Sequence, residues 1–235
     1  MNKIGIVVAM EDEVEGIIDL MTDLENETLY NLNFYKGKIQ GKNCVVVESG
    51  IGKVNAGRAT QALIDKFKVT SIINVGAAAS VNELLNIGDV VLGKFTIQHD
   101  FDITAFDHSK GYITGVGYGV ESDERLIEES KNVIDKIQNK DFDVKVGNVA
   151  TGDIFCTEVS MKDKISAKFD ADVVDMECGA VAQVAYLCDI PFMAIRSVSD
   201  TPNGNNAEDF DNNLAKASSI CAEVLKEVIK NVNFA

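Results

Sequence analysis

The stretch Pro191-Phe-Met-Ala-Ile-Arg-Ser-Val-Ser-Asp200 is a mostly apolar run that ends in an acid, and Ala171-Asp-Val-Val-Asp-Met-Glu177 follows the same pattern. Short runs of this kind are typical of buried strands in an α/β sheet. Ligands of such sheets bind beyond the carboxyl ends of the strands, which is where Glu177 and Asp200 fall. Two carboxylates at that edge predict acid–base chemistry on a polar small molecule.

Strand-like and helix-like segments alternate along the whole chain. Runs rich in β-branched residues predict strands, and apolar residues at helical spacing predict helices. The alternation predicts one domain over residues 1–235, an α/β fold of three-layer α/β/α form with a central mixed, mostly parallel sheet. The predicted strands are 4–9, 44–48, 71–75, 89–93, 145–150, 173–176 and 192–198, with a hairpin strand in 30–40; the predicted helices are 11–20, 54–67, 123–138, 178–188 and 210–232.

The composition narrows the classes of partner. The chain has 235 residues, 46% of them hydrophobic, and a formal charge of −15. Nucleic acids and anionic membranes attract Lys- and Arg-rich surfaces, so this charge argues against both. We find no apolar run of transmembrane length and no signal-peptide pattern at the N-terminus. Five scattered cysteines and two histidines predict reduced thiols in a cytoplasmic protein that has no metal site.

Several motifs have a structural interpretation beside a functional one. Ser49-Gly-Ile-Gly-Lys-Val-Asn-Ala56 joins a strand to a helix and is neither a Walker A loop nor a dinucleotide-binding motif, so a tight turn explains it as well as a ligand does. The acids of Met10-Glu-Asp-Glu-Val-Glu15 favour a helix N-terminus in any case. Glu177 and Asp200 also fit as a first-turn acid and a turn acid. Arg196, inside a buried strand, requires a carboxylate partner.

Seven motifs in one order resemble those of a known family. They are Gly5-Ile-Val-Val-Ala-Met-Glu-Asp-Glu-Val14, Ser49-Gly-Ile-Gly-Lys-Val-Asn55, Ile72-Ile-Asn-Val-Gly76, His99-Asp100 with Thr104-Ala-Phe106, Thr151-Gly-Asp-Ile-Phe155, Val174-Asp-Met-Glu177 and Arg196-Ser-Val-Ser-Asp200. The chain is similar in this to the 5′-methylthioadenosine/S-adenosylhomocysteine nucleosidases of the nucleoside phosphorylase/hydrolase superfamily. The resemblance implies a homodimeric N-glycosyl hydrolase without a cofactor, which releases adenine in methionine salvage and nucleoside catabolism.

The resemblance also implies roles for residues at matching positions. Glu13 matches the base for the attacking water, Asp200 the acid that protonates N7 of adenine, and Glu177 the group that holds the sugar hydroxyls. The other implied substrate-binding residues are Met176 at the ribose, Phe155 and Cys156 at adenine, Arg196 and Ser199 in support, Met10, Ile51 and Phe210 around the ribose and 5′ group, and Ile103 and Phe106, which reach the neighbouring subunit's pocket.

The two strand-end acids have different expected protonation states. A purine leaves as an anion unless it is protonated, so we expect burial to keep Asp200 protonated near neutral pH. The sugar develops positive charge during the reaction, so we expect Glu177 to be ionised.

One motif departs from the family pattern, and two alternative functions stay open. The family commonly has Gly-Ser/Thr-Ala-Gly-Gly where this chain has Gly76-Ala-Ala-Ala-Ser80, so Ala77 lacks a hydroxyl and Ala79 carries a methyl group. The alternatives are a purine nucleoside phosphorylase, disfavoured by the absence of an arginine after the first and third strands, and a catalytically weak purine-nucleoside-binding protein. The sequence does not rank methylthio, homocysteinyl, deoxy and aminofutalosine 5′ groups.

Overall fold

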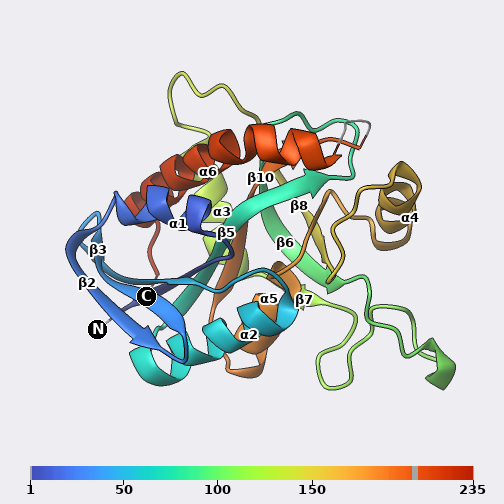
Figure 1. Cartoon of the computed structure of the whole chain (residues 1–235), viewed down its shortest axis with the longest axis horizontal. Helices are drawn as coiled ribbons and strands as arrows, with labels where there is room; N and C mark the ends of the chain where they lie inside the picture. The colour runs from blue at the N-terminus through green and yellow to red at the C-terminus, as the bar shows by residue number, and fades with distance from the viewer. Residues whose placement is uncertain (1, 203–205, 235) are drawn as a thin grey trace.

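One sheet forms the centre of the computed structural model, which describes residues 2–202 and 206–234 (Figure 1). Its order is β10-β6-β8-β9-β5-β1-β4-β3-β2, with β7 beside β6. The strands are β1 Ile4–Val8, β2 Thr22–Leu29, β3 Leu32–Ile39, β4 Lys42–Glu48, β5 Ser71–Ser80, β6 Val90–Gln98, β7 Val120–Glu121, β8 Val144–Thr151, β9 Val173–Asp175 and β10 Phe192–Asp200. The helices are α1 Glu11–Ile18, α2 Lys53–Ala62, α3 Glu124–Ile134, α4 Val159–Phe169, α5 Cys178–Leu187 and α6 Asn206–Asn231, with a π turn at Leu63–Phe67 and a 3-10 turn at Thr104–Phe106.

The sheet is mixed, as predicted. Parallel pairings join β4 to β1, β1 to β5 and β5 to β10, and also β6 to β8 and β8 to β9. The hairpin strands β2, β3 and β4 pair in antiparallel fashion, as do β5 with β9 and β6 with β10 and β7. Because β10 pairs with both β5 and β6, the strands β5, β9, β8, β6 and β10 close into a ring. This closure brings the ends of β5, β9 and β10 together.

Successive side chains of β1 enter opposite cores. Ile4, Ile6 and Val8 pack with α1, α3 and α6, whereas Val7 packs with α2 and α5. The two-residue alternation of a strand therefore buries both faces of the sheet. Figure 1 shows α1 and α6 on one side of the sheet and α2 and α5 on the other, which confirms the predicted three-layer architecture. In the part of the chain that the structure describes, we find no helix with the length and apolar character to cross a membrane.

The sequence patterns miss three elements and shorten others. The side chains of β2 are almost all exposed, so this strand has no apolar alternation to reveal it. The two-residue β7 is too short for a pattern, and α4 buries only Lys162, Ile165 and Phe169. The strands predicted at 71–75 and 89–93 continue to Ser80 and Gln98, and the end of the helix predicted at 54–67 is a π turn.

Candidate active site

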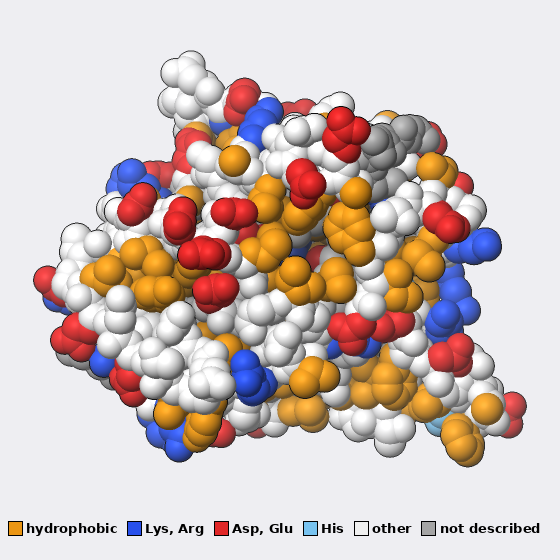
Figure 2. Space-filling model, in the orientation of Figure 1, with side chains coloured by type: hydrophobic (Ala, Val, Ile, Leu, Met, Phe, Trp, Pro, Cys, Tyr) orange, Lys and Arg blue, Asp and Glu red, His pale blue; other side chains and the backbone are white. Residues whose placement is uncertain are grey.

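A cavity of about 130 Å³ lies at the carboxyl ends of β1, β5, β8, β9 and β10. In Figure 2, apolar side chains gather around a hollow near the centre of this face, with acidic side chains to its left. The predicted site residues that line the cavity are Met10, Glu13, Ile51, Phe155, Cys156, Met176, Glu177, Asp200 and Phe210. The fold therefore brings together acids that lie far apart in the sequence.

Four predicted site residues do not line this cavity. Arg196 and Ser199 belong to β10 and are buried behind its wall. Ile103 and Phe106 lie after β6, on a segment that runs away from the sheet at the lower right of Figure 1. The Phe106 side chain is 75% exposed. Ile103 and Phe106 therefore take no part in lining the cavity of their own chain.

Three backbone N–H groups hold the carboxylate of Glu13. Oε2 accepts hydrogen bonds from Ala9 at 3.0 Å and Met10 at 3.1 Å, and Oε1 accepts one from Ala77 at 2.9 Å. An ionised carboxylate has about four acceptor positions, so Oε1 retains room for one further donor such as a water. Burial raises the pKa of Glu13, and these N–H groups together with the charge of Arg196 offset this only in part. A raised pKa makes Glu13 a stronger base.

Gly76 provides the space that Glu13 fills. A Cβ at this position would lie 2.7 Å from Oε1 of Glu13, closer than packed atoms tolerate. The next residue, Ala77, contacts Glu13 through its backbone, so the hydroxyl that Ala77 lacks is not needed for this hydrogen bond.

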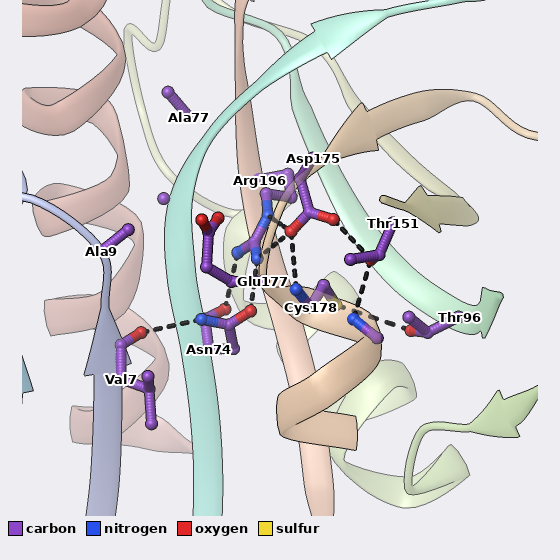
Figure 3. Close-up of polar contacts among 12 residues, drawn as sticks. Val7, Ala9, Asn74, Ala77, Thr96, Thr151, Asp175, Glu177, Cys178 and Arg196 are labelled. Atoms are coloured by element: carbon purple, nitrogen blue, oxygen red, sulfur yellow. Dashed lines mark hydrogen bonds and ion pairs between the residues drawn. The ribbon is translucent and has the colours of Figure 1, made fainter. Parts of the chain in front are cut away.

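A buried polar network around Arg196 lies beside Glu177 (Figure 3). Nε and Nη2 of Arg196 donate to Oδ2 of Asp175 at 3.1 and 2.6 Å, which confirms the predicted carboxylate partner. Arg196 also donates to the carbonyl and the side-chain oxygen of Asn74, and the Asn74 amide donates to the carbonyl of Val7 at 2.9 Å. The network therefore ties β10 and β9 to β5 and β1 directly below the cavity.

Asp175 also fixes the start of α5. Its Oδ2 accepts the N–H of Cys178 at 2.8 Å, and its Oδ1 accepts the hydroxyl of Thr151 at 2.5 Å. The Thr151 oxygen in turn accepts the N–H of Gly179 at 2.7 Å. These contacts satisfy N–H groups that a helix N-terminus leaves unpaired. They also set the position of Glu177, which directly precedes the helix.

Glu177 lines the cavity and is protonated at neutral pH. Burial and the nearby charge of Asp175 raise the pKa of Glu177 to about 8. The expectation of an ionised Glu177 is therefore wrong for the free site, because Asp175 already neutralises the one buried guanidinium nearby. Oε1 of Glu177 accepts the N–H of Gly52 at 2.8 Å, and Gly52 has a φ of 98° that favours glycine.

Asp200 forms an ion pair with a residue that the sequence patterns do not reveal. Its Oδ2 lies 2.8 Å from Nζ of Lys162, and the two side chains are 1% and 0% exposed. Its Oδ1 accepts the hydroxyl of Ser199 at 2.9 Å. The expectation that Asp200 is protonated stays a prediction, now for a carboxyl group that has a buried lysine as its partner.

The mouth of the cavity is aromatic and firmly anchored. Phe155 and Phe210 meet edge to face, with ring centroids 5.5 Å apart and an angle of 83°. Nearby, Nζ of Lys53 lies 2.6 Å from Oδ1 of Asp100, whose Oδ2 accepts the N–H of Asp153 at 2.9 Å. The Asp153 carboxylate accepts the N–H of Lys53 at 2.8 Å, so Lys53, Asp100 and Asp153 form a closed ring of contacts. The loops that carry Ile51 and Phe155 are thus held together at the rim.

A larger hollow of about 990 Å³ lies between β6, β8 and α3. Its lining mixes Lys94 and Lys131 with Glu121, Glu124 and Glu128, and it contains no predicted site residue. Glu13 and Glu177, the buried acids with raised pKa values, line the smaller cavity, so we place the candidate active site there.

Lys162 and Asp175 are the site components that the sequence analysis misses. Asp175 lies in the motif Ala171–Glu177 quoted above. Arg196 was expected to need a carboxylate partner, and this expectation could have identified Asp175. Lys162 has a weaker signal: it lies at helical spacing with Ile165 and Phe169, the other buried residues of α4. A lysine in such an apolar stripe needs a carboxylate, but the spacing does not say which one.

The mixed α/β fold and the buried acids at its strand ends can now be compared with known classes of protein. A sequence model of the phosphorylase superfamily matches residues 3–230, nearly the whole chain. This class comprises α/β proteins of the kind described above. Its relatives narrow the assignment further.

The relatives are nucleoside-cleaving enzymes. The 5′-methylthioadenosine/S-adenosylhomocysteine nucleosidase of Staphylococcus haemolyticus is 36% identical over 228 residues, which cover 97% of this chain and 99% of the relative. The structure of that nucleosidase from Neisseria meningitidis with methylthio-immucillin-A has a TM-score of 0.94 at 32% identity, over 98% and 99% of the chains. Futalosine hydrolase of Helicobacter pylori has a TM-score of 0.91 at 32% identity, over 97% of each chain. This chain belongs to the 5′-methylthioadenosine/S-adenosylhomocysteine nucleosidase family.

Proposed function

We propose that this chain, acting as one catalytic domain, hydrolyses the N-glycosidic bond of 5′-methylthioadenosine and S-adenosylhomocysteine. The products are adenine and the 5′-thioribose. The observation that carries the proposal is the convergence of Glu13, Glu177 and Asp200 on one cavity. The relatives named above carry this activity in their names. Family membership and site geometry thus support the same reaction.

The three acids divide the reaction between them. Glu13 takes a proton from the water that attacks the anomeric carbon, through the acceptor position left on Oε1. Asp200 delivers a proton to N7 of adenine, so that the base leaves as a neutral species. Glu177 holds the ribose hydroxyls, and its carboxyl oxygens stabilise the positive charge that develops on the sugar.

The remaining residues bind and support. Phe155 offers an aromatic face to adenine, and the backbone at Cys156 reads the edge of the base. Met10, Ile51, Met176 and Phe210 form apolar walls around the ribose and the 5′ group. Arg196 and Ser199 act behind the wall, where they hold Asp175 and Asp200 in place. The site requires no cofactor for this chemistry.

Water rather than phosphate is the acceptor. Four carboxyl groups line the cavity, and one of them, Asp175, is already paired with the buried Arg196. A phosphate dianion would meet more negative than positive charge there. The test is adenine release from 5′-methylthioadenosine with and without phosphate. We expect release without phosphate and a free sugar as product; a phosphate requirement with a sugar 1-phosphate product would establish a phosphorylase instead.

Asp200→Asn distinguishes the enzyme from a binding protein. We expect this variant to bind adenine about as tightly as the wild type while adenine release falls by about 10²–10⁴. A wild-type chain that binds adenine but releases none from any 5′-substituted adenosine would support the binding protein.

The preferred 5′ group is a separate question. The apolar mouth accepts methylthio and homocysteinyl groups, and the fold is shared with a futalosine hydrolase. A panel of 5′-methylthioadenosine, S-adenosylhomocysteine, 5′-deoxyadenosine and aminofutalosine, compared by kcat/KM, would rank them. We expect the two thioethers to be the best substrates.

The working form is a cytoplasmic homodimer active in methionine salvage. Ile103 and Phe106 project away from their own cavity, which suits a contribution to the neighbouring subunit's site. All five cysteines are free thiols, as a reducing compartment favours.

A further inference from the structure

Lys162 lies directly behind the acid that faces the base. Asp200 lines the cavity, whereas Lys162 contacts Asp200 from the far side, with Nζ 2.8 Å from Oδ2. Nζ also lies 3.4 Å from the carbonyl oxygen of Thr201. The order is therefore cavity, carboxylate, ammonium. A proton on Lys162 is one carboxyl group away from a ligand in the cavity.

Stability alone does not account for this pair. Replacing a buried ion pair by apolar side chains of similar volume is often neutral or stabilising. Lys162 also sits near the N-terminus of α4, where the helix dipole disfavours a cation. Burial and the helix dipole thus make this ion pair a poor source of stability. A role in the reaction explains it better.

The leaving base requires a proton, and the group that faces it, Asp200, is the acidic partner of a buried ion pair with Lys162. We propose that Lys162 stores this proton and passes it to Asp200 as Asp200 protonates N7 of the purine. This inference rests on the proposed function. One N–H bond of Lys162 breaks as an O–H bond forms on Asp200, and this O–H bond then breaks as the proton moves to N7. The electron pair of the broken glycosidic bond stays on the purine, and water adds to the sugar with loss of its proton to Glu13.

The surroundings suit a neutral lysine after the transfer. Burial favours the uncharged amine, and lysine loses its proton more readily than arginine. The titratable group that also faces the pair is Cys156, and burial raises the pKa of its thiol, so it stays neutral. The other charged or titratable groups around the cavity are Glu13, Asp175, Glu177 and Arg196. Lys162 touches no substrate, so it is a positioning residue that acts through Asp200.

The pH profile of Lys162→Met tests this directly. Methionine fills a similar volume, and Asp200 must then bind the proton by itself. We expect adenine release by the wild type to continue to alkaline pH. We expect the alkaline limb of kcat/KM in Lys162→Met to move down by at least about one pH unit, with recovery to within about tenfold of wild type near pH 5.

Lys162→Arg separates charge from proton supply. A guanidinium keeps the ion pair but does not release its proton in proteins. We expect Lys162→Arg to fold, to bind adenine and to lose activity by about 10² at every pH. The matched control is Lys164→Met, on an exposed position of the same helix, whose profile should follow that of the wild type.

Three results would overturn the inference. The first is a Lys162→Met profile that is scaled down without a shift, which would mean that the lysine only supports the structure. The second is an alkaline limb that moves up, which would mean that Lys162 opposes protonation of Asp200. The third is wild-type activity in Lys162→Arg. If neither variant folds, the wild-type pH profile of kcat/KM decides. An alkaline limb that falls below about pH 7 would contradict proton storage on Lys162. A wild type that releases no adenine would instead refute the proposed function.

Discussion

The guanidinium of Arg196 and the carboxylate of Asp175 meet at 2.6 Å, with only 2% and 1% of their side chains exposed. The pair joins β10 to β9 directly beneath the candidate active site (Figure 3). Because Arg196 neutralises Asp175, Glu177 has no cation as its own partner. A single ion pair thus supports the structure and also sets the protonation of a neighbouring acid.

Breaking the ion pair between Arg196 and Asp175 should destabilise the folded protein strongly. We expect Arg196→Met to lower the free energy of unfolding by about 3–5 kcal/mol, because it leaves Asp175 buried without its partner. Urea denaturation at neutral pH measures the change. Adding Asp175→Leu should restore part of the loss, since the stranded charge is then gone. A single variant as stable as the wild type would show that the network does not depend on the pair.

Gly76→Ala should impair catalysis far more than stability. The added Cβ would lie 2.7 Å from Oε1 of Glu13 and would displace the base from its three N–H donors. We expect kcat to fall by about 10²–10⁴, with adenine binding retained. Ala77→Gly is the matched control, because it keeps the backbone N–H that Glu13 accepts. Equal losses in both variants would mean that strand flexibility, rather than the position of Glu13, is responsible.

Much of the fold follows from local patterns, but the closure of the sheet does not. The alternation of Ile6 and Val7 between two cores is visible in the sequence as a run without polar residues. The pairing of β10 with both β5 and β6 depends on contacts between distant segments. No periodicity within one strand encodes such a contact. The exposed β2 likewise lacks an apolar face and is placed by its hairpin with β3.

The acids of the candidate site could be predicted from the sequence, but the charged partner that each acid meets could not. The strand-end positions of Glu177 and Asp200 follow from the sheet architecture. Their protonation depends on which cation each one meets, and that is decided by tertiary contacts. Arg196 is taken by Asp175, and the raised pKa of Glu177 reverses the ionised state expected of this acid in the free site. Asp200 meets Lys162, which comes from α4.

The raised pKa of Glu177 should appear in the pH dependence of stability. The folded value is about 8 against an ordinary value of 4.5. Between these pH values the unfolded chain has lost the proton that the folded chain retains. The free energy of unfolding therefore falls as pH rises, by about 5 kcal/mol over the whole window, and levels off above it. Below pH 4.5 the contribution is fully present.

Glu177→Gln removes this contribution while it keeps an oxygen for the N–H of Gly52. We expect a flatter stability profile between about pH 5 and about pH 8, measured by denaturation at a series of pH values. Glu13 titrates in both proteins, so its contribution cancels in the comparison. Glu15→Gln, exposed on α1, is the control and should keep the wild-type slope. Identical slopes in all three proteins would contradict a proton on Glu177.

The projecting segment should control both assembly and activity. Phe106 is 75% exposed in the single chain and does not line the cavity of that chain. We expect Phe106→Ser to weaken the dimer by sedimentation and to lower activity most at low protein concentration. Leu84→Ser removes another side chain, one that is 84% exposed, and should change neither. A wild type that sediments as a monomer with full activity would place the whole site within one chain, because no second copy could then complete it.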